Sequence, residues 1–366
     1  MDRRYPDKQA GNGKVLTVIG NRPQFIKAAA VSGPLRAVAD EVLVHTGQHY
    51  DEAISQVFFD ELGLPRPEHR LELGGGSNAA QTARMLAALE PLLASERPAL
   101  VLVYGDTNST LAGALAGAQA RIPVAHVEAG MRSFDRRMPE ELNRVLTDHL
   151  SDLLLAPSDT AVENLRREGV AGAVRLVGDV MVDVAHLVQP RAREDLAPLR
   201  AAGVEPGAYV VATAHRAGNV DDPTRLGMLV ALLRAVPGQV VLPLHPRTRA
   251  RLQDAGLLDE LAAEVALTPP LGPLAFTSLL VHARAVLTDS GGVQKEAYLA
   301  GVPCVTLRDT TEWVETVDTG WNVLVDLDAA AALQALGREL PAARPELYGD
   351  GRAGERVVAE LAALPA

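Results

Sequence analysis

Polar residues follow four short apolar runs of the chain, and their types suit acid–base chemistry on a charged ligand. They are Asp106 after 101–104, Glu128 after 124–127, His215 after 210–213 and Ser290 after 286–288. Ligands of an open parallel sheet bind outside the carboxyl ends of its strands. Carboxyl and imidazole groups transfer protons. The pattern therefore predicts an enzyme that acts on a phosphorylated or nucleotide-linked substrate.

The run Ser290-Gly291-Gly292, between an apolar run and a helical stretch, is the strongest phosphate signal. Glycine lets the backbone approach a ligand closely, and a helix N-terminus presents free N–H groups to an anion. Glu296 lies about one turn later and could accept hydrogen bonds from ribose hydroxyls. A serine-capped helix with Glu296 in a capping role is the structural alternative.

The stretch 20–27 places two cations at the start of an expected helix. Pro23 suits a first helical turn, and Arg22 and Lys27 would add positive charge where the helix already favours an anion. Two surface cations are the structural alternative. The stretch lacks the glycine pattern of a dinucleotide site, so NAD binding is not predicted.

Each acid also has a structural interpretation. Asp106 could cap a helix over 108–119, whereas Glu128 ends an apolar strand, where a buried acid is costly unless it is paired or functional. Glu140 opens a helix, where acids complement the dipole, and its i,i+4 spacing to Arg144 allows a surface ion pair.

The histidines His215 and His245 both follow apolar runs and could be hydrogen-bonded structural residues. If Asp106, Glu128, Glu140 and His215 instead converge on one site, they could perform both an acid and a base step. No stretch has a metal-ligand spacing such as His-Glu-x-x-His, so neither a metal nor another cofactor is predicted.

The bulk properties narrow the class of protein. A length of 366 residues suggests two domains, and the net charge of −11 argues against a nucleic-acid partner. The single cysteine, Cys304, lies in an apolar run and is expected to be buried. No apolar run reaches membrane-spanning length, and residues 1–4 lack the apolar core of a signal peptide. A cytoplasmic protein without a membrane partner is expected, with a disordered leader over 1–12.

Short β-branched runs alternate with alanine- and leucine-rich helical stretches, which predicts an α/β fold with parallel sheets. A linker near 178–181 separates two strand series. The expected strands are 14–19, 41–46, 99–104, 122–128 and 153–156 in the first series, and 208–214, 239–243, 264–268, 285–288 and 302–307 in the second. Helices are expected between those of the first series, near 23–37, 50–62, 78–94, 107–119 and 139–149.

Several motifs occur in an order that resembles the non-hydrolysing UDP-N-acetylglucosamine 2-epimerases, over roughly residues 14–325. They are Gly20-Asn21-Arg22-Pro23-Gln24-Phe25-Ile26-Lys27, Thr46-Gly47-Gln48-His49, Tyr104-Gly105-Asp106-Thr107, His126-Val127-Glu128-Ala129-Gly130, Pro139-Glu140-Glu141, Asn143-Arg144 and Thr288-Asp289-Ser290-Gly291-Gly292. The resemblance implies two Rossmann-like domains in a GT-B arrangement, with a C-terminal helix that crosses back to the first domain. The implied domains are 13–182 plus about 350–366, and 183–349, which binds UDP. A homodimer is expected.

The family reaction inverts C2 of a UDP-sugar without a cofactor, by elimination and re-addition of UDP through a 2-acetamidoglucal. The resemblance places Asp106, Glu128, Glu140 and His215 at catalytic positions. It places Arg22, Lys27, Phe276, Ser290, Gly291, Gly292 and Glu296 at substrate- and UDP-binding positions. Gln48, His49, Arg216 and His245 are candidates for an allosteric UDP-N-acetylglucosamine site.

Three departures from the family pattern leave the sugar open. Trp313 stands where many members carry arginine, Leu271 replaces a glutamine, and Ala217-Gly218 replaces an Arg-Glu pair. The first expectation is UDP-N-acetylglucosamine as a precursor of surface polysaccharide. The alternative substrate is UDP-2,3-diacetamido-2,3-dideoxyglucuronic acid. A GT-B glycosyltransferase, a hydrolysing epimerase and a UDP-sugar sensor are the other functions considered.

Overall fold

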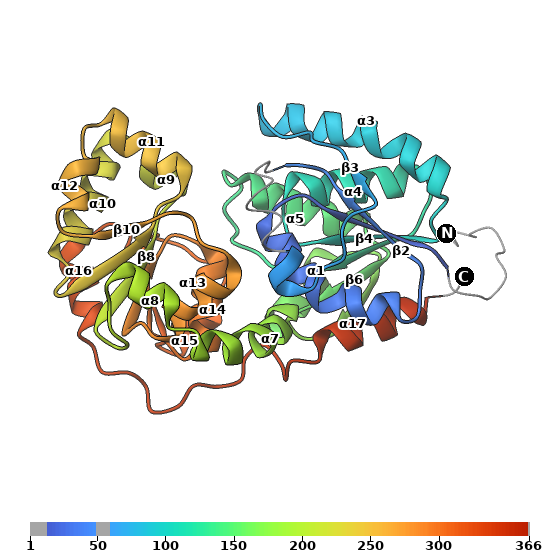
Figure 1. Cartoon of the computed structure of the whole chain (residues 1–366). Helices are drawn as coiled ribbons and strands as arrows, with labels where there is room; N and C mark the ends of the chain where they lie inside the picture. The colour runs from blue at the N-terminus through green and yellow to red at the C-terminus, as the bar shows by residue number, and fades with distance from the viewer. Residues whose placement is uncertain (1–12, 49–58, 365–366) are drawn as a thin grey trace. The chain divides into compact units, whose positions relative to one another are not determined.

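The computed structural model describes residues 13–48 and 59–364 (Figure 1). The chain folds into two compact units. Unit 1 ends at Val184 and resumes at Leu347, and unit 2 spans Ala185–Glu346. The sequence predicted that the first domain ends at 182 and resumes at about 350. The leader expected over 1–12 lies outside the described residues, as do positions 50–58 of the helix expected near 50–62.

Unit 1 is built on a seven-stranded parallel sheet with the order β3-β2-β1-β4-β5-β6-β7. The strands are β1 (Val15–Ile19), β2 (Glu41–His45), β3 (His69–Arg70), β4 (Leu100–Tyr104), β5 (Val124–Val127), β6 (Leu153–Ala156) and β7 (Ala173–Leu176). The strand order reverses between β1 and β4, and ligands bind at such a point in open α/β sheets.

Unit 1 contains several helices. They are α1 (Arg22–Arg36), α3 (Asn78–Glu96), α4 (Asn108–Gln119), α5 (Pro139–Leu150), α6 (Asp159–Glu168), the first residues of α7 (Val180–Glu194) and α17 (Ala353–Ala362). All of them except α7 and α17 connect its parallel strands. The sheet core consists of fully buried side chains such as Leu16, Val44 and Val103. Their burial supplies the main apolar stabilisation of the sheet.

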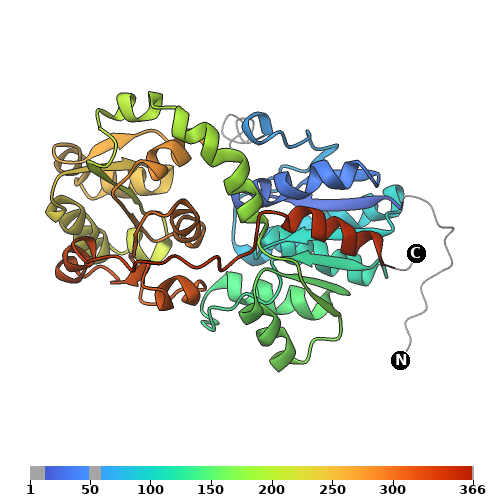
Figure 2. The ribbon, with the colours of Figure 1, turned by 90° about the horizontal axis from the view of Figure 1, so that it is seen from below.

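The C-terminal helix α17 returns to unit 1 and lies beside α1 (Figures 1 and 2). A Cβ atom at Gly354 would lie 2.2 Å from the carbonyl oxygen of Ala30, so the close approach requires glycine. The Asp183 carboxylate of α7 accepts hydrogen bonds from the N–H groups of Ala353 (3.1 Å) and Gly354 (2.8 Å). These contacts anchor α17 and confirm that the C-terminal helix crosses back to the first domain.

Unit 2 contains a six-stranded parallel sheet with the order β10-β9-β8-β11-β12-β13. The strands are β8 (Tyr209–Thr213), β9 (Gln239–Pro243), β10 (Ala266–Thr268), β11 (Ala285–Thr288), β12 (Cys304–Thr306) and β13 (Asn322–Leu324). The strand order reverses between β8 and β11. Cys304 is buried in β12, as the sequence predicted.

The helices of unit 2 pack on both sides of this sheet (Figure 2). They are the remainder of α7, α8 (Ala197–Ala202), α9 (Ala217–Val220), α10 (Pro223–Ala235), α11 (Pro246–Asp254), α12 (Leu258–Ala262), α13 (Pro273–Val281), α14 (Gly291–Ala300), α15 (Val314–Asp318) and α16 (Ala329–Leu336). No helix within 13–48 and 59–364 is long and apolar enough to span a membrane.

The sequence missed three strands and misplaced a linker. β3, β7 and β13 lie at sheet edges and are mostly partly exposed or exposed, so they lack the apolar run that marks a buried strand. The linker expected near 178–181 overlaps the start of α7, which begins at Val180 and continues past the unit boundary with Pro190 inside it.

Candidate active site

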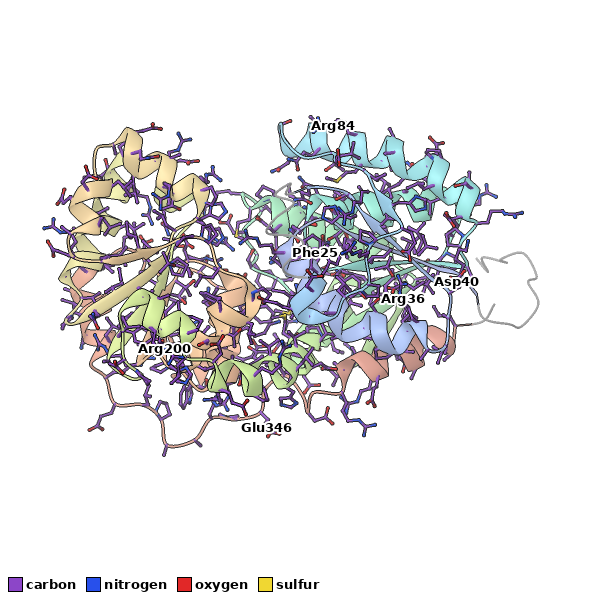
Figure 3. The ribbon with its side chains drawn as sticks, in the orientation of Figure 1. Phe25, Arg36, Asp40, Arg84, Arg200 and Glu346 are labelled. Carbon is purple, nitrogen blue, oxygen red and sulfur yellow. The ribbon has the colours of Figure 1, made fainter. Side chains whose placement is uncertain are left out.

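The first candidate site lies at the carboxyl ends of β1, β4 and β5 in unit 1. Asn21 caps α1, and the Gln24 side chain accepts from the N–H of Gly20 (2.7 Å) and donates to the carbonyl of Tyr104 (2.9 Å). The Gln24 amide therefore fixes the start of α1 against the end of β4. Phe25, labelled in Figure 3, packs on the same unit's β2, with its ring centroid 5.0 Å from that of His45.

Glu128 forms a buried ion pair with Lys27. A Cβ atom at Gly105 would lie 3.0 Å from Lys27 Nζ and 3.3 Å from Glu128 Oε2, so the pair lies against the Gly105 backbone. The φ of Glu128 is +72°, in the left-handed region that residues with a Cβ rarely adopt. A strained backbone at a buried acid is typical of functional sites. Lys27 is not a surface cation, which excludes the structural alternative for this residue.

Asp106 does not cap α4. Thr107 is the cap, in a capping box with Thr110, and Asp106 Oδ2 lies 2.5 Å from Arg144 Nη2. Arg144 is only 4% exposed and also contacts Glu141 at 3.2 Å. The predicted surface pair of Glu140 with Arg144 is therefore wrong, because Arg144 is directed inward to β4 by the packing of α5.

The two adjacent acids at the start of α5 have different environments. Glu141 is 2% exposed and accepts hydrogen bonds from Ser133 N (2.8 Å), Ser133 Oγ (2.9 Å) and Phe134 N (3.1 Å). Glu140 is partly exposed in the first turn. Glu141 therefore holds the loop before α5, and Glu140 is the acid available for chemistry.

The second candidate site lies at the carboxyl ends of β8 and β11 in unit 2. Asp289 is fully buried and accepts hydrogen bonds from the backbone N–H groups of His215 (3.0 Å) and Arg216 (2.9 Å). His215 Nδ1 lies 3.5 Å from Asp289 Oδ1, and the His215 and His245 rings are stacked with centroids 5.4 Å apart. Asp289 thus holds the His215 turn, while His245 caps α11 through the N–H of Arg247 (3.1 Å).

Polar groups converge at the N-terminus of α14. Ser290 occupies the N-cap position, but its side chain makes no capping hydrogen bond, so the capping interpretation of Ser290 is wrong. A Cβ atom at the exposed Gly292 would lie 3.9 Å from Ser290 Oγ and 4.0 Å from Glu296 Oε1. Glu296 is six residues after the cap, beyond the first turn, so a capping role is wrong for it too. Burial raises the pKa of Glu296 to about 7, although the charge of Lys295 acts to lower it.

A buried cluster of charged residues, Lys295, Arg308 and Glu312, packs against the start of α14. No sequence pattern indicated that these side chains lie together. A Cβ atom at Gly291 would lie 2.0 Å from Glu312 Oε1, so only glycine fits against this carboxylate. Arg308 donates to Glu312 at 2.9 Å. Lys295 Nζ lies 3.9 Å from the ring centroid of the buried Trp313. Trp313, the residue that departs from the family pattern, therefore makes a cation–π contact with Lys295.

The remaining predicted residues lie nearby or outside these clusters. Arg22 opens α1 and is partly exposed, and Phe276 on α13 packs partly buried against the unit 2 core. Gln48 accepts from Ser109 N (3.0 Å) and Ser109 Oγ (2.7 Å), which ties it to α4. His49 lies outside the described residues. Among the described residues, no three His, Cys, Asp or Glu side chains are grouped to hold a metal ion.

Unit 1 thus brings Lys27 and Glu128 together against Gly105, the residue before Asp106, and unit 2 brings Ser290, Gly292 and Glu296 together. In chemical terms, unit 1 presents carboxyl groups paired with cations, which suits proton transfer and charge stabilisation. Unit 2 presents a helix N-terminus, a hydroxyl and a carboxyl group, which suits a phosphorylated ribose. Each unit therefore presents its polar groups at the carboxyl ends of its parallel strands.

Comparison with known proteins identifies the family. The model of the family described as UDP-N-acetylglucosamine 2-epimerase matches residues 35–362. The chain is 47% identical to the UDP-2,3-diacetamido-2,3-dideoxy-D-glucuronate 2-epimerase of Pseudomonas aeruginosa, over 96% of this chain and 100% of the relative. It is 41% identical to the UDP-N-acetylglucosamine 2-epimerase of Methanocaldococcus jannaschii, over 94% of this chain and 98% of the relative.

Solved structures agree. The structure of the Methanocaldococcus jannaschii UDP-GlcNAc 2-epimerase in complex with UDP-GlcNAc and UDP matches with a TM-score of 0.89 and 40% identity, over 95% of this chain and 99% of that one. The UDP-GlcNAc 2-epimerase from Neisseria meningitidis, bound to UDP-GlcNAc, matches with a TM-score of 0.83 and 28% identity, over 95% and 99% of the two chains. These neighbours are GT-B-like, which confirms the predicted fold class. The chain therefore belongs to the UDP-N-acetylglucosamine 2-epimerase family, whose members are isomerases.

Proposed function

We propose that this protein epimerises UDP-N-acetylglucosamine reversibly at C2 to UDP-N-acetylmannosamine, as a step toward surface polysaccharide precursors. The observation that carries the proposal is the buried ion pair of Lys27 and Glu128 beside the Gly105–Asp106 turn. A buried, strained acid next to a second paired acid provides the groups that proton transfer requires.

The proposed reaction proceeds by elimination and re-addition. In the first step the C2–H and C1–O bonds break, a C1=C2 double bond forms, a protein base takes the proton, and UDP leaves with the electron pair. The 2-acetamidoglucal then accepts a proton on the opposite face of C2 while UDP re-forms the bond to C1. Asp106, Glu128 and Glu140 are the candidate acids and bases, and His215 is a further candidate.

UDP recognition is assigned to unit 2. The free N–H groups of α14, the Ser290 hydroxyl and Glu296 are suited to a diphosphate and a ribose. Gly292 leaves the space that the approach of a phosphate to the backbone requires, because the described atoms nearest to a Cβ at that position, apart from its chain neighbours and helix backbone, are Ser290 Oγ at 3.9 Å and Glu296 Oε1 at 4.0 Å. Arg22 and Phe276 complete the proposed binding groups.

Incubation with UDP-N-acetylglucosamine in D2O, followed by NMR, tests this function. Deuterium at C2 together with UDP-N-acetylmannosamine is the expected result. Release of free N-acetylmannosamine and UDP would indicate a hydrolysing enzyme, and turnover only with an added acceptor would indicate a glycosyltransferase. Binding without any turnover would leave a UDP-sugar sensor.

The relative at 47% identity favours a second candidate substrate, UDP-2,3-diacetamido-2,3-dideoxyglucuronic acid. Its C6 carboxylate requires a cation. Arg132 is a poor choice, because Asp148 and Glu168 already hold its buried guanidinium. Arg216 is the better candidate. Its side chain is partly exposed, and its ion pair with Glu312 is longer, with 3.9 Å between Nη2 and Oε1.

The two substrates are separated by side-by-side measurement of kcat/KM. A preference for the uronic acid above about 100-fold, equivalent to about 2.7 kcal/mol of transition-state discrimination, would replace UDP-N-acetylglucosamine as the proposed substrate. An Arg216→Lys variant, which keeps the charge but loses the planar fork, should then lose activity on the uronic acid more than on UDP-N-acetylglucosamine.

A homodimer and a cytoplasmic location complete the proposal. Light scattering of the purified full chain tests the first, and cell fractionation tests the second.

A further inference from the structure

His126, on β5, is a fully buried residue between two oxygen atoms. Its Nδ1 lies 2.7 Å from Asp148 Oδ1, and its Nε2 lies 2.7 Å from the carbonyl oxygen of Gly105. A neutral imidazole has one N–H and could donate to only one of them. The second short contact requires another proton, either on the ring or on Asp148.

The surroundings of Asp148 place that proton on the ring. Asp148 Oδ2 accepts from the N–H of Gly130 at 3.0 Å and lies 2.7 Å from Arg132 Nη2. Burial opposes ionisation of Asp148, but the charged Arg132 guanidinium at 2.7 Å favours the carboxylate form, and the pKa of this carboxyl is lowered. With Asp148 ionised, His126 must supply both N–H groups.

The charges around the ring favour the same assignment. Arg132 donates to both Glu168 oxygens, at 2.8 and 2.7 Å, in addition to its contact with Asp148. His149 is exposed, and its Nε2 lies 3.8 Å from Glu168. The buried Asp148 and the partly exposed Glu168 therefore face one guanidinium, and a protonated His126 supplies the second positive charge. Unpaired buried charge is costly, so the neutral arrangement is favoured.

The two hydrogen bonds of the ring connect the ends of two neighbouring strands. Gly105 directly follows β4 and precedes Asp106, whereas Gly130 lies two residues after Glu128 at the end of β5. A Cβ atom at Gly130 would lie 2.3 Å from the carbonyl oxygen of Ala161, so this turn has little freedom to adjust. His126 and Asp148 together thus fix both loops that carry the candidate acids.

We propose that a doubly protonated His126, held by Asp148, is a positioning pair that sets the separation of Asp106 and Glu128 for the epimerisation. The inference rests on the proposed function. His126 does not transfer a proton to the substrate in this scheme. It acts through the Gly105 carbonyl, and Asp148 acts through the Gly130 amide.

Three variants test the pair. His126→Asn leaves an amide near the Nδ1 position and loses the bond to Gly105, whereas His126→Gln leaves an amide near the Nε2 position and loses the bond to Asp148. Asp148→Asn removes the charge at constant shape. Misplacement of reacting groups by about 1 Å costs about 100-fold in rate. We therefore expect kcat and C2 deuterium exchange to fall about 10- to 100-fold, with KM and UDP affinity within about 3-fold of wild type, and His126→Gln to be less impaired than His126→Asn.

A matched control is His69→Asn, because His69 is also paired with an acid in unit 1, with its Nε2 2.9 Å from Glu96 Oε1, but lies on the edge strand β3. It should leave kcat unchanged. Folded His126 and Asp148 variants with wild-type kcat, or with a raised KM alone, would overturn the proposal.

A second measurement tests the proposed state of His126 even if the variants fail to fold. In 15N-histidine NMR of the wild-type chain at pH 8, His126 should show two protonated ring nitrogens, and a single-proton tautomer would overturn the proposal. Lack of wild-type turnover on any UDP-sugar would count against the proposed function, while the NMR result would still decide the state of His126.

Discussion

Lys27 in α1 and Glu128 at the end of β5 form a buried ion pair although 101 residues separate them. The pair crosses the point where the strand order of unit 1 reverses, between β1 and β4. Removal of one partner from such a pair leaves an uncompensated buried charge. The same contact therefore serves both the stability of unit 1 and the position of a candidate catalytic acid.

The Lys27→Met variant should lower the free energy of unfolding by about 3–5 kcal/mol, because Glu128 loses its buried ion pair with Lys27. Adding Glu128→Gln should recover much of that loss, since the amide is neutral. Urea unfolding, followed by circular dichroism, gives the free energy of unfolding of wild type, both single variants and the double variant, which completes the double-mutant cycle. Additive effects of the two substitutions would contradict a coupled pair.

Glu128→Gln and Glu140→Gln should each lower turnover by about 10²–10⁴, which is the usual cost of losing a general acid or base. UDP affinity, measured by calorimetry, should stay close to wild type, because neither acid belongs to the groups assigned to UDP, which are the start of α14, Glu296, Arg22 and Phe276. Glu141→Gln is the control from the same helix turn. It should lower the melting temperature, because Glu141 is buried and accepts from Ser133 and Phe134. Near-normal epimerisation by both Glu128 and Glu140 variants would remove these acids from the mechanism.

The adjacent glycines at the start of α14 should respond differently to alanine. Gly292→Ala should keep the melting temperature but weaken UDP binding by about 10-fold or more, equivalent to about 1.4 kcal/mol, because the new methyl group fills open space between Ser290 and Glu296. Gly291→Ala should destabilise the protein by about 1–3 kcal/mol, since its Cβ would clash with Glu312. Calorimetry and thermal unfolding of both variants separate the two effects, and equal UDP affinities for Gly292→Ala and wild type would argue against phosphate binding at this turn.

Glu296→Gln should change the pH dependence of stability. Burial raises the Glu296 pKa from 4.5 to about 7 in the folded protein. Between these values the folded state binds more protons than the unfolded chain, so the contribution of Glu296 to stability falls as pH rises. Glutamine cannot ionise. The variant should therefore gain in free energy of unfolding relative to wild type between pH 5 and pH 8, as denaturant titrations at each pH would measure.

The same variant should show the opposite trend in ligand binding. If the Glu296 carboxylate accepts hydrogen bonds from ribose hydroxyls, the UDP affinity of wild type should rise relative to Glu296→Gln as pH increases through 7. Pyrophosphate is the control ligand, because it has no ribose, and its affinity for wild type should not rise relative to Glu296→Gln over the same pH range. Parallel pH profiles for UDP would place Glu296 outside the ribose site.

The sequence by itself determined the α/β class, most of the strands and the order of the family motifs. These features follow from local patterns, because β-branched runs, glycine turns and helix starts depend on neighbouring residues. Asp106, Glu128, His215 and Ser290 could be marked as strand-end residues for the same reason. The short edge strands β3, β7 and β13 carried too little local pattern to be found.

Only the tertiary structure decided which polar groups are paired. The sequence could not distinguish Glu140 from Glu141, nor direct Arg144 to Asp106 instead of the helix surface. No local pattern indicated that His126 contacts both Gly105 and Asp148. Such pairs depend on strand order and register, which bring residues from distant parts of the chain to the same end of a sheet. The cost of burying a charge then selects the partner that completes each pair.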